Sequence, residues 1–441
     1  MKLFYLVIIF IFFQNCSFDN KTGIWKNENQ TLNQDNDIFK EFDTLLTSSE
    51  TFNRIVPIQK NFRFKLDKPK KNFKWNDIFF EKTNNLSNIK YNNLNELLFK
   101  SKKISKHKIS NFILFDNNYL LVNDIKGNLI SFSFNEKKII NKFNFYKKKY
   151  KKIDKILNFI VDEGIVYVAD NIGYLYALDY KKNSLLWAKN YKIPFRSNIK
   201  ILEERLVVAD QNNTLHFVDK RSGENFNSIP TEETLVKNNF INNLSANDNL
   251  ILFLNTYGSL YAINRKTMKV IWFLNLNQSL DLNPSNLFLG NQIINYKNKI
   301  AVSSNFYTYI LDATTGSIIY KFKFSTLIKP VILNDYLFAI SKNNLLISLN
   351  LKNGKIIYSY DINEEISNFL NTKKKEIQIK DILIANNKIF IFLNNSYFLK
   401  FNISGKLENV NKLPTKINTQ PILINGSLLY LDNKNQISLV D

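Results

Sequence analysis

Eight segments of the chain share one pattern of apolar and polar positions. Each begins with an apolar run rich in β-branched and aromatic residues, crosses a short polar turn, and ends with a second apolar run. Two such runs joined by a short turn predict a β-hairpin. The predicted hairpins cover residues 119–134, 165–179, 206–219, 250–264, 300–312, 336–350, 389–402 and 428–441.

The hairpins recur at a regular spacing. Asp or Asn ends each unit, at positions 135, 179, 219, 264, 312, 350, 402 and 441, so the units are about 44 residues apart. The side chain of such a residue can accept backbone N–H groups two residues on, which favours a turn. Units of this length with three or four strands are typical of β-propeller blades. A solenoid is the alternative, but no helical periodicity separates the strands. The sequence therefore predicts an all-β, eight-bladed β-propeller.

Ring closure is expected to come from the N-terminal side. Most hairpins are followed by a turn and a third strand, whereas the last one stops at Asp441. The apolar and aromatic segment Asn72–Glu81 is the predicted partner that completes the last blade and removes its exposed edge. The propeller then spans residues 71–441. Residues 16–70 are interpreted as a polar tether, with a short helix near 38–46 and a strand near 62–66.

Residues 1–15 have the composition of a signal peptide. One lysine precedes the apolar run Leu3–Phe13, which is too short to cross a bilayer as a stable helix. The run ends close to Cys16, and a cysteine at this place is the layout of a bacterial lipoprotein signal, in which the cysteine is acylated and anchors the chain. An aromatic residue and Asn15 stand where such signals usually have Leu and a small residue. An ordinary signal peptide with an incidental cysteine is therefore the alternative.

The formal net charge of +22 raises the question of a nucleic-acid or membrane-surface function. Lysines are spread over turns and strand edges along the whole chain, which indicates a compositional bias. The densest run joins Lys147–Lys149 to Lys151, Lys152 and Lys155. It is interpreted as a solvated loop, with anionic lipid head groups as the functional alternative. No aromatic stacking platform accompanies the run, so nucleic acid is not an expected partner.

The repeat at residues 165–190, IVYVADNIGYLYALDYKKNSLLWAKN, carries a family resemblance. Residues 260–272, LYAINRKTMKVIW, repeat its second half. Both are similar to the PQQ-like propeller repeat. With eight blades and Cys16, the whole chain resembles the BamB family of outer-membrane lipoproteins. The resemblance implies a non-catalytic scaffold of the outer-membrane β-barrel assembly machine, held at the periplasmic face by a lipid anchor. The implied partners are the POTRA domains of BamA and nascent outer-membrane proteins.

The resemblance also implies a docking loop. BamB proteins contact BamA through a loop that reads apolar, any residue, apolar, Arg after an early blade, and Ile193, Phe195 and Arg196 match it. We expect Phe195 and Arg196 to be exposed as interface anchors. In the alternative, Phe195 lies under the next blade and Arg196 pairs with a carboxylate such as Glu203 or Glu204. A second family contact, an acidic pair one blade later, has no counterpart in NNFINNLS at residues 238–245.

Quinoprotein dehydrogenases use the same repeat and are the enzymatic alternative; a periplasmic propeller with another partner is a third. The dehydrogenases resemble one another in a vicinal cysteine pair over the quinone, and the one cysteine here, Cys16, precedes the propeller. The two histidines, His107 and His216, have no neighbouring Cys or His that would complete a metal site. Trp187 and Trp272 share one repeat position and are predicted to be inter-blade core. No catalytic residue, cofactor or metal site is expected.

Overall fold

The computed structural model describes residues 16–18, 25–27, 52, 55–146, 150–234, 239–277 and 287–441. The chain divides into two compact units, Met1–Thr47 and Ser48–Asp441. In the first unit, β1 (Cys16–Phe18) and β2 (Trp25–Asn27) form an antiparallel pair. The predicted signal peptide and the predicted helix near 38–46 lie outside the described residues.

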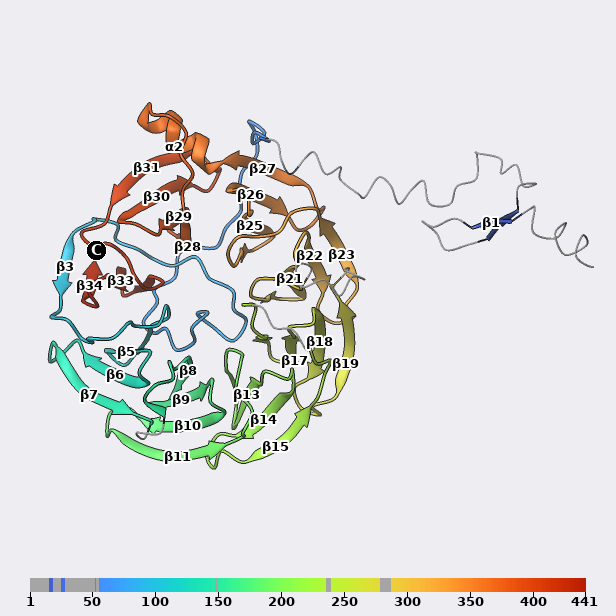
Figure 1. Ribbon diagram of the computed structural model, residues 1–441. Coiled ribbons are helices and arrows are strands. Elements are labelled where there is room, and N and C mark those ends of the chain that lie inside the picture. Colours follow the sequence, from blue (N-terminus) through green and yellow to red (C-terminus); the bar gives the residue numbers. More distant parts are fainter. Residues whose placement is uncertain are drawn as a thin grey trace, which may run out of the picture. The chain divides into compact units, whose positions relative to one another are not determined.

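In the second unit, eight antiparallel sheets of four strands stand around a ring, as Figure 1 shows. Each sheet is one blade, so the predicted eight-bladed propeller is confirmed. The blades are numbered 1 to 8 from the sheet that contains β4 to the sheet that contains β32. The innermost strands of blades 1 to 8 are β4 (Leu114–Asp116), β8 (Leu157–Asp162), β12 (Lys200–Leu202), β16 (Asn243–Ala246), β20 (Ile294–Tyr296), β24 (Val331–Leu333), β28 (Ile379–Ala385) and β32 (Ile422–Ile424).

The other three strands of each blade follow outward in the same blade order. The second strands are β5 (Tyr119–Asn123), β9 (Ile165–Asp170), β13 (Arg205–Ala209), β17 (Leu250–Leu254), β21 (Lys299–Ser303), β25 (Tyr336–Ile340), β29 (Lys388–Leu393) and β33 (Ser427–Leu431). The third strands are β6 (Asn128–Ser133), β10 (Tyr174–Asp179), β14 (Leu215–Asp219), β18 (Ser259–Asn264), β22 (Thr308–Asp312), β26 (Leu345–Asn350), β30 (Tyr397–Asn402) and β34 (Ile437–Val440). The outermost strands are β7 (Lys138–Asn144), β11 (Ser184–Asn190), β15 (Asn225–Ile229), β19 (Val270–Asn275), β23 (Ile318–Phe322), β27 (Ile356–Asp361), β31 (Leu407–Lys412) and β3 (Leu97–Lys100).

The middle strands of a blade are buried on both faces, because a neighbouring blade packs against each face. In blade 2, β9 and β10 are buried along almost their whole length, whereas the outermost strand β11 alternates between exposed and half-buried positions. A strand buried on both faces reads as a continuous apolar run. This explains why the second and third strands are the clear hairpins in the sequence, and the outermost strands are the weaker signal.

The turn after the third strand is held by the predicted Asp or Asn. In blade 2, Asp179 Oδ1 accepts the backbone N–H groups of Lys181 and Lys182 at 3.0 and 2.9 Å. The same pair of bonds recurs at Asp219 in blade 3 and at Asp312 in blade 5. The carboxylate thus replaces the backbone carbonyl of a conventional turn.

Tryptophans join neighbouring blades, as the sequence predicts. Trp187 and Trp272 lie on the outermost strands β11 and β19, and each indole N–H donates to a main-chain carbonyl of the next blade at 3.1 Å. Each ring covers a glycine of that blade, Gly223 or Gly316, where a Cβ atom would lie 2.5 Å from the ring. These glycines also have positive φ angles, which side chains disfavour.

The ring is closed by β3 and not by the predicted segment. Leu97 and Lys100 of β3 pair with Val440 and Ser438 of β34, so one N-terminal strand completes a sheet of three C-terminal strands. The prediction that Asn72–Glu81 closes the ring is therefore wrong. An outermost strand needs little apolar content because most of its residues are exposed, as they are in β3. The more aromatic segment is buried inside the ring instead.

Two further local features differ from the sequence prediction. Residues 62–66 form no strand; Phe62 and Phe64 pack edge-on against Tyr336 of β25, with ring centroids 6.1 and 4.9 Å away. One helix, α2 (Ile362–Leu370), lies between blades 6 and 7. It begins after Asp361, whose carboxylate accepts two backbone N–H groups of the first turn.

Candidate functional site: the axial segment and the docking loop

Residues 72–92, termed the axial segment, run through the inside of the ring (Figure 1). Hydrogen bonds join this segment to the innermost strand of each blade or to the turn that follows it. In order, they link Asn72 to Leu423 and Asn425 of blade 8, Trp75 to Phe115 of blade 1, Asn76 to Val161 of blade 2, Asp77 to Lys200 of blade 3, Lys82 to Ala246 of blade 4, Thr83 to Asn295 of blade 5, Asn85 to Ile332 of blade 6, Ile89 to Ile384 of blade 7, and Asn92 to Gly426 of blade 8. The segment therefore makes one full circuit of the ring.

Lys200 of β12 places a fully buried ammonium group against the axial segment. Its Nζ lies 2.6 Å from Asp77 Oδ2, 2.5 Å from Asn84 Oδ1 and 3.1 Å from the Glu81 carbonyl oxygen. Burial lowers the pKa of Lys200, and the Asp77 carboxylate opposes this shift. Three acceptors match the three N–H donors of the ammonium group. The charge is therefore fully satisfied by the axial segment.

A second cation, Lys329, also binds the axial segment. Its Nζ donates to the main-chain carbonyls of Phe79 and Asn84 at 3.2 and 2.7 Å. Burial lowers the pKa of Lys329 to about 8. Burial also raises the pKa of Asp381, on β28, to about 6. Within the described part of the chain, no group of three His, Cys, Asp or Glu side chains could hold a metal ion.

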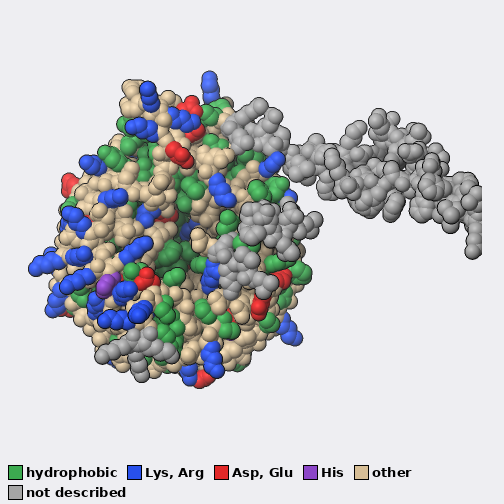
Figure 2. Space-filling model, in the orientation of Figure 1, with side chains coloured by type: hydrophobic (Ala, Val, Ile, Leu, Met, Phe, Trp, Pro, Cys, Tyr) green, Lys and Arg blue, Asp and Glu red, His purple; other side chains and the backbone are tan. Residues whose placement is uncertain are grey.

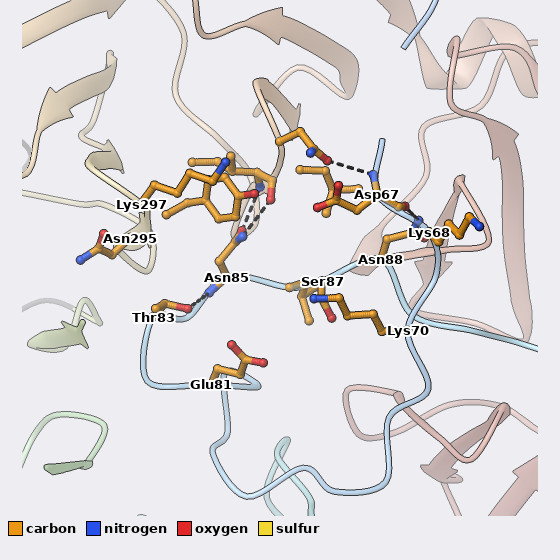
Figure 3. Close-up of a pocket in the computed structure, with 15 residues that line it drawn as sticks. Asp67, Lys68, Lys70, Glu81, Thr83, Asn85, Ser87, Asn88, Asn295 and Lys297 are labelled. Carbon is orange, nitrogen blue, oxygen red and sulfur yellow. Dashed lines mark hydrogen bonds between the residues drawn. The ribbon is translucent and has the colours of Figure 1, made fainter. Parts of the chain in front are cut away.

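A cavity of about 270 Å³ opens beside the axial segment, and Figure 3 shows its lining. The walls come from Lys70, from Glu81 and Asn85 of the axial segment, and from Lys297 and Asn334 in turns of blades 5 and 6. Burial raises the pKa of Glu81. The lining mixes polar side chains with apolar ones such as Leu86 and Leu333, and it contains no histidine or cysteine, so it offers no imidazole base or thiol nucleophile.

The predicted docking residues lie in the connection between β11 of blade 2 and β12 of blade 3. Phe195 is 2% exposed and packs edge-on against Tyr191 and His216, with ring centroids 5.3 and 6.1 Å away. The expectation of an exposed Phe195 is therefore wrong. The Phe195 backbone bridges to Asp210 of blade 3, and this contact directs the ring into the interface between the two blades.

Ile193 and Arg196 are half-buried on either side of Phe195. The Arg196 guanidinium donates to the carbonyl of Phe240 at 3.0 Å, which ties this loop to the next inter-blade connection. Burial lowers the pKa of Arg196. The carboxylates considered as its partners bind other arginines: Glu203 binds Arg265 and Glu204 binds Arg221.

The remaining predicted residues belong to other parts of the chain. Cys16 lies in β1 of the first unit. Lys147–Lys149 lie outside the described residues. Lys155 is 4% exposed and donates to the carbonyls of Tyr150 and Ile153, so it belongs to the packed structure and not to a free surface.

His216 is a packed residue, as the sequence predicts. Its Nε2 lies 2.9 Å from Asp210 Oδ2 and its Nδ1 lies 3.0 Å from Ser228 Oγ. Sequence reasoning missed Lys200 and the polar side chains of the axial segment. The available signal was a stretch outside the repeat that combines aromatic residues with many asparagines.

The comparisons with known proteins agree with this architecture. Residues 147–360 match the model of the family described as "Outer membrane protein assembly factor BamB". The fold is similar to that of BamB from Moraxella catarrhalis, with a TM-score of 0.62 and 13% identity over 78% of this chain and 99% of that chain. The chain has the fold of a BamB-like β-propeller. No curated protein matches its sequence.

Two other kinds of protein share this fold. The computationally designed Ika8 protein is 10% identical, with a TM-score of 0.60 over 78% of this chain and 99% of that chain. Quinohemoprotein alcohol dehydrogenase from Comamonas testosteroni is 10% identical, with a TM-score of 0.61 over 83% of this chain and 80% of that chain. Because one fold can host unrelated functions, a functional argument has to rest on the site.

Proposed function

We propose that this chain is a non-catalytic scaffold lipoprotein of the outer-membrane β-barrel assembly complex. In this role it docks on the POTRA domains of BamA and assists the folding and insertion of outer-membrane proteins. The observation that carries the proposal is the match of residues 147–360 to the BamB family model. That range includes the whole loop that holds Ile193, Phe195 and Arg196.

The geometry of this loop supports docking through Ile193 and Arg196. Phe195 fixes the loop between blades 2 and 3, and the Arg196 bond to Phe240 fixes it to the following connection. A loop that is already ordered loses little conformational entropy when a partner binds. Arginine is also enriched among the residues that dominate binding energy at protein interfaces.

The residues that occupy the inside of the ring favour the role of a scaffold over that of a dehydrogenase. The axial segment contacts all eight blades there, and its oxygen atoms accept hydrogen bonds from both Lys200 and Lys329. The cavity beside Glu81 contains no histidine or cysteine. The chain also has one cysteine, Cys16, and so lacks a vicinal cysteine pair.

In this proposal the chain is held at the periplasmic face of the outer membrane by an acylated Cys16. The support is the apolar run that ends close to this cysteine. None of the helices in the described residues is long and apolar enough to span a membrane. Mass spectrometry of the N-terminus of the membrane-extracted protein tests the acylation, and an unmodified thiol at Cys16 would contradict it.

Crosslinking in native membranes, followed by affinity purification of the full chain, tests the docking. We expect BamA to be recovered with the unmodified chain, and about tenfold less with Ile193→Glu, because a charge would replace an interface aliphatic group. Arg196→Glu should also lose BamA. It additionally removes a charge-assisted hydrogen bond to Phe240, which costs about 1.5–3 kcal/mol of unfolding free energy.

The matched control is Leu186→Glu, which changes a 51% exposed side chain on the neighbouring strand β11 and should leave BamA recovery unchanged. Melting temperatures of all three variants separate docking from folding. If folded Ile193→Glu recovers BamA as well as the unmodified chain does, the loop is structural and docking lies elsewhere. If the unmodified chain recovers a different protein reproducibly, it is a periplasmic propeller with another partner.

A further inference from the structure

A groove of about 490 Å³ lies between blade 8 and blade 1, at the outer edge of the ring where β3 and β7 are neighbours (Figure 1). Its apolar surface comes from Phe99, Ile104, Phe132 and Ile139. Its cationic surface comes from Lys100, Lys102, Lys103, Lys137 and Lys138. No carboxylate lines it. A cavity of this size lies in the range that binds small organic molecules.

Most of the lysines in this groove have no counter-charge. Lys138 binds Glu136 at 2.8 Å, and Lys100 lies 3.9 Å from the buried Asp432. For Lys102, Lys103 and Lys137, no carboxylate of the described residues lies within ion-pair distance. Figure 2 shows Lys and Arg side chains gathered over this side of the ring.

The junction between blades 2 and 3 shows that this arrangement is not a general property of the repeat. There, Glu224 immediately precedes the outermost strand β15 and binds Lys189 of the preceding blade's outermost strand. At the same register position of blade 1, the chain has Lys138, which binds Glu136 of its own turn and lines the groove with the lysines of β3 and the loop after it. The sign of the charge at this position is reversed, and the lysines that line the groove take the place of the ion pair between blades.

The loop that follows β3 holds its lysines in fixed positions. The N–H groups of Ser101 and Ile104 donate to the carbonyls of Ile437 and Asn435, both at 3.0 Å. The Asn435 side chain donates in turn to the Ser105 carbonyl at 3.0 Å. Five of the nine residues from 100 to 108 are lysines, and none is acidic. The cationic surface is therefore built into the fold of blade 8.

We propose that this groove binds an anionic phospholipid at the membrane surface. The lysines hold the phosphate head group, and part of an acyl chain lies along the half-buried Phe99 and the exposed Ile139. Clustered lysines beside exposed apolar side chains are the combination that attracts proteins to anionic bilayers. A phospholipid satisfies both surfaces of the groove at once, whereas free phosphate would leave the apolar surface in water.

Photocrosslinking on the full chain tests this site directly. A photoreactive p-benzoylphenylalanine replaces Ile139, and the purified protein is mixed with vesicles of phosphatidylcholine that contain a minor fraction of phosphatidylglycerol. We expect phosphatidylglycerol adducts in excess of its mole fraction. The matched control carries the same group at Val270, which opens β19 at the corresponding register and is 42% exposed, against 38% for Ile139. Adducts at Val270 should follow the lipid composition.

The lysines are tested with Lys102→Glu/Lys103→Glu in the chain that carries the probe at position 139. We expect the phosphatidylglycerol adduct to fall about tenfold or more, because each lysine near an anionic surface contributes roughly fivefold in binding. Lys266→Glu/Lys269→Glu makes the same change of charge in a turn of blade 4 and should have no effect. If the first double variant does not fold, Lys137→Glu replaces it.

Three results would overturn the proposal. They are adducts at position 139 that follow the lipid composition, an enrichment that survives the lysine reversals, and an enrichment abolished by millimolar inorganic phosphate alone. A single-stranded oligonucleotide that crosslinks at position 139 while lipids do not would identify a nucleic-acid groove instead. None of these outcomes depends on docking to BamA, so the two proposals fail independently.

Discussion

The repeats and the axial segment are stabilised in opposite ways. A blade is held by contacts that are local in sequence, such as the hydrogen bonds from Asp179 to the turn two and three residues later. The axial segment has a few local bonds, such as that from the Phe79 N–H to Asp77 Oδ1, but its contacts with the blades join residues far apart in the sequence. Asn85 bonds to Ile332 and Asn92 to Gly426, over hundreds of residues of chain. The ring therefore combines blades whose turns are held by local hydrogen bonds with one segment whose conformation depends on contacts with every blade.

This contrast explains how a ring of self-contained blades is joined into one structure. Neighbouring blades meet through Trp187 and Trp272, so each such contact couples two blades. The axial segment couples eight. Asparagine suits this task because its side-chain amide both donates and accepts, and so can pair with a backbone strand. We expect damage to the axial segment to affect the whole ring and damage to a repeat contact to stay local.

The largest effect is expected from removing the axial segment. A chain that begins at Asn93 keeps every blade, including β3, but removes the partners of the innermost strands, of the buried Lys200 and of the half-buried Lys329. We expect the loss of most of the unfolding free energy, which is about 5–15 kcal/mol for a typical domain. Thermal melting and size-exclusion chromatography measure it. A chain that begins at Ser48, the start of the compact unit, is the control and should melt like the full chain. If the chain that begins at Asn93 folds with an unchanged melting temperature, the axial segment does not stabilise the whole ring.

The next largest effect is expected at the buried ion pair. Asp77→Ala leaves Lys200, which is fully buried, without its carboxylate, and should cost about 3–5 kcal/mol in chemical denaturation. The control is Glu204→Ala, which breaks the exposed pair with Arg221 and should cost about 0–1 kcal/mol. The double variant Asp77→Leu/Lys200→Met should recover much of the loss, because an apolar pair needs no counter-charge. If Asp77→Ala and Glu204→Ala lose the same unfolding free energy, the buried pair of Asp77 and Lys200 contributes no more to stability than an exposed ion pair.

The smallest effect is expected at a single inter-blade contact. Gly316→Ala introduces a Cβ 2.5 Å from the Trp272 ring at a φ of +74°, so both packing and backbone are strained. We expect a loss of about 1–3 kcal/mol. Gly164→Ala is the control, because its φ is +83° but no atom lies within 4 Å of the new Cβ. The difference between the two variants isolates the inter-blade packing. Equal losses would mean that backbone strain alone accounts for the change.

The prediction of the candidate site was less complete than that of the fold, for physical reasons. Ile193, Phe195 and Arg196 lie between two blades, as the sequence predicts, but Phe195 is buried and not exposed. Whether a loop side chain faces solvent depends on the blade beside it, here on Tyr191 and His216. The cationic groove was missed because Lys100, Lys102 and Lys103 precede the first predicted hairpin, whereas Lys137 follows it. These lysines become neighbours because β3, which comes before blade 1 in the sequence, pairs with β34 and so completes blade 8 beside blade 1.

The eight hairpins, their spacing and the Asp or Asn turns could be predicted from the sequence, because each depends on residues within a few positions of one another. The tertiary structure alone decided which N-terminal segment closes the ring and which one fills it. Both β3 and Asn72–Glu81 have apolar residues, and neither local pattern shows which of the two pairs with β34. The choice depends on burial: the outer edge of blade 8 accepts an exposed strand, whereas the axis accepts aromatic and amide side chains that can pair with eight blades at once.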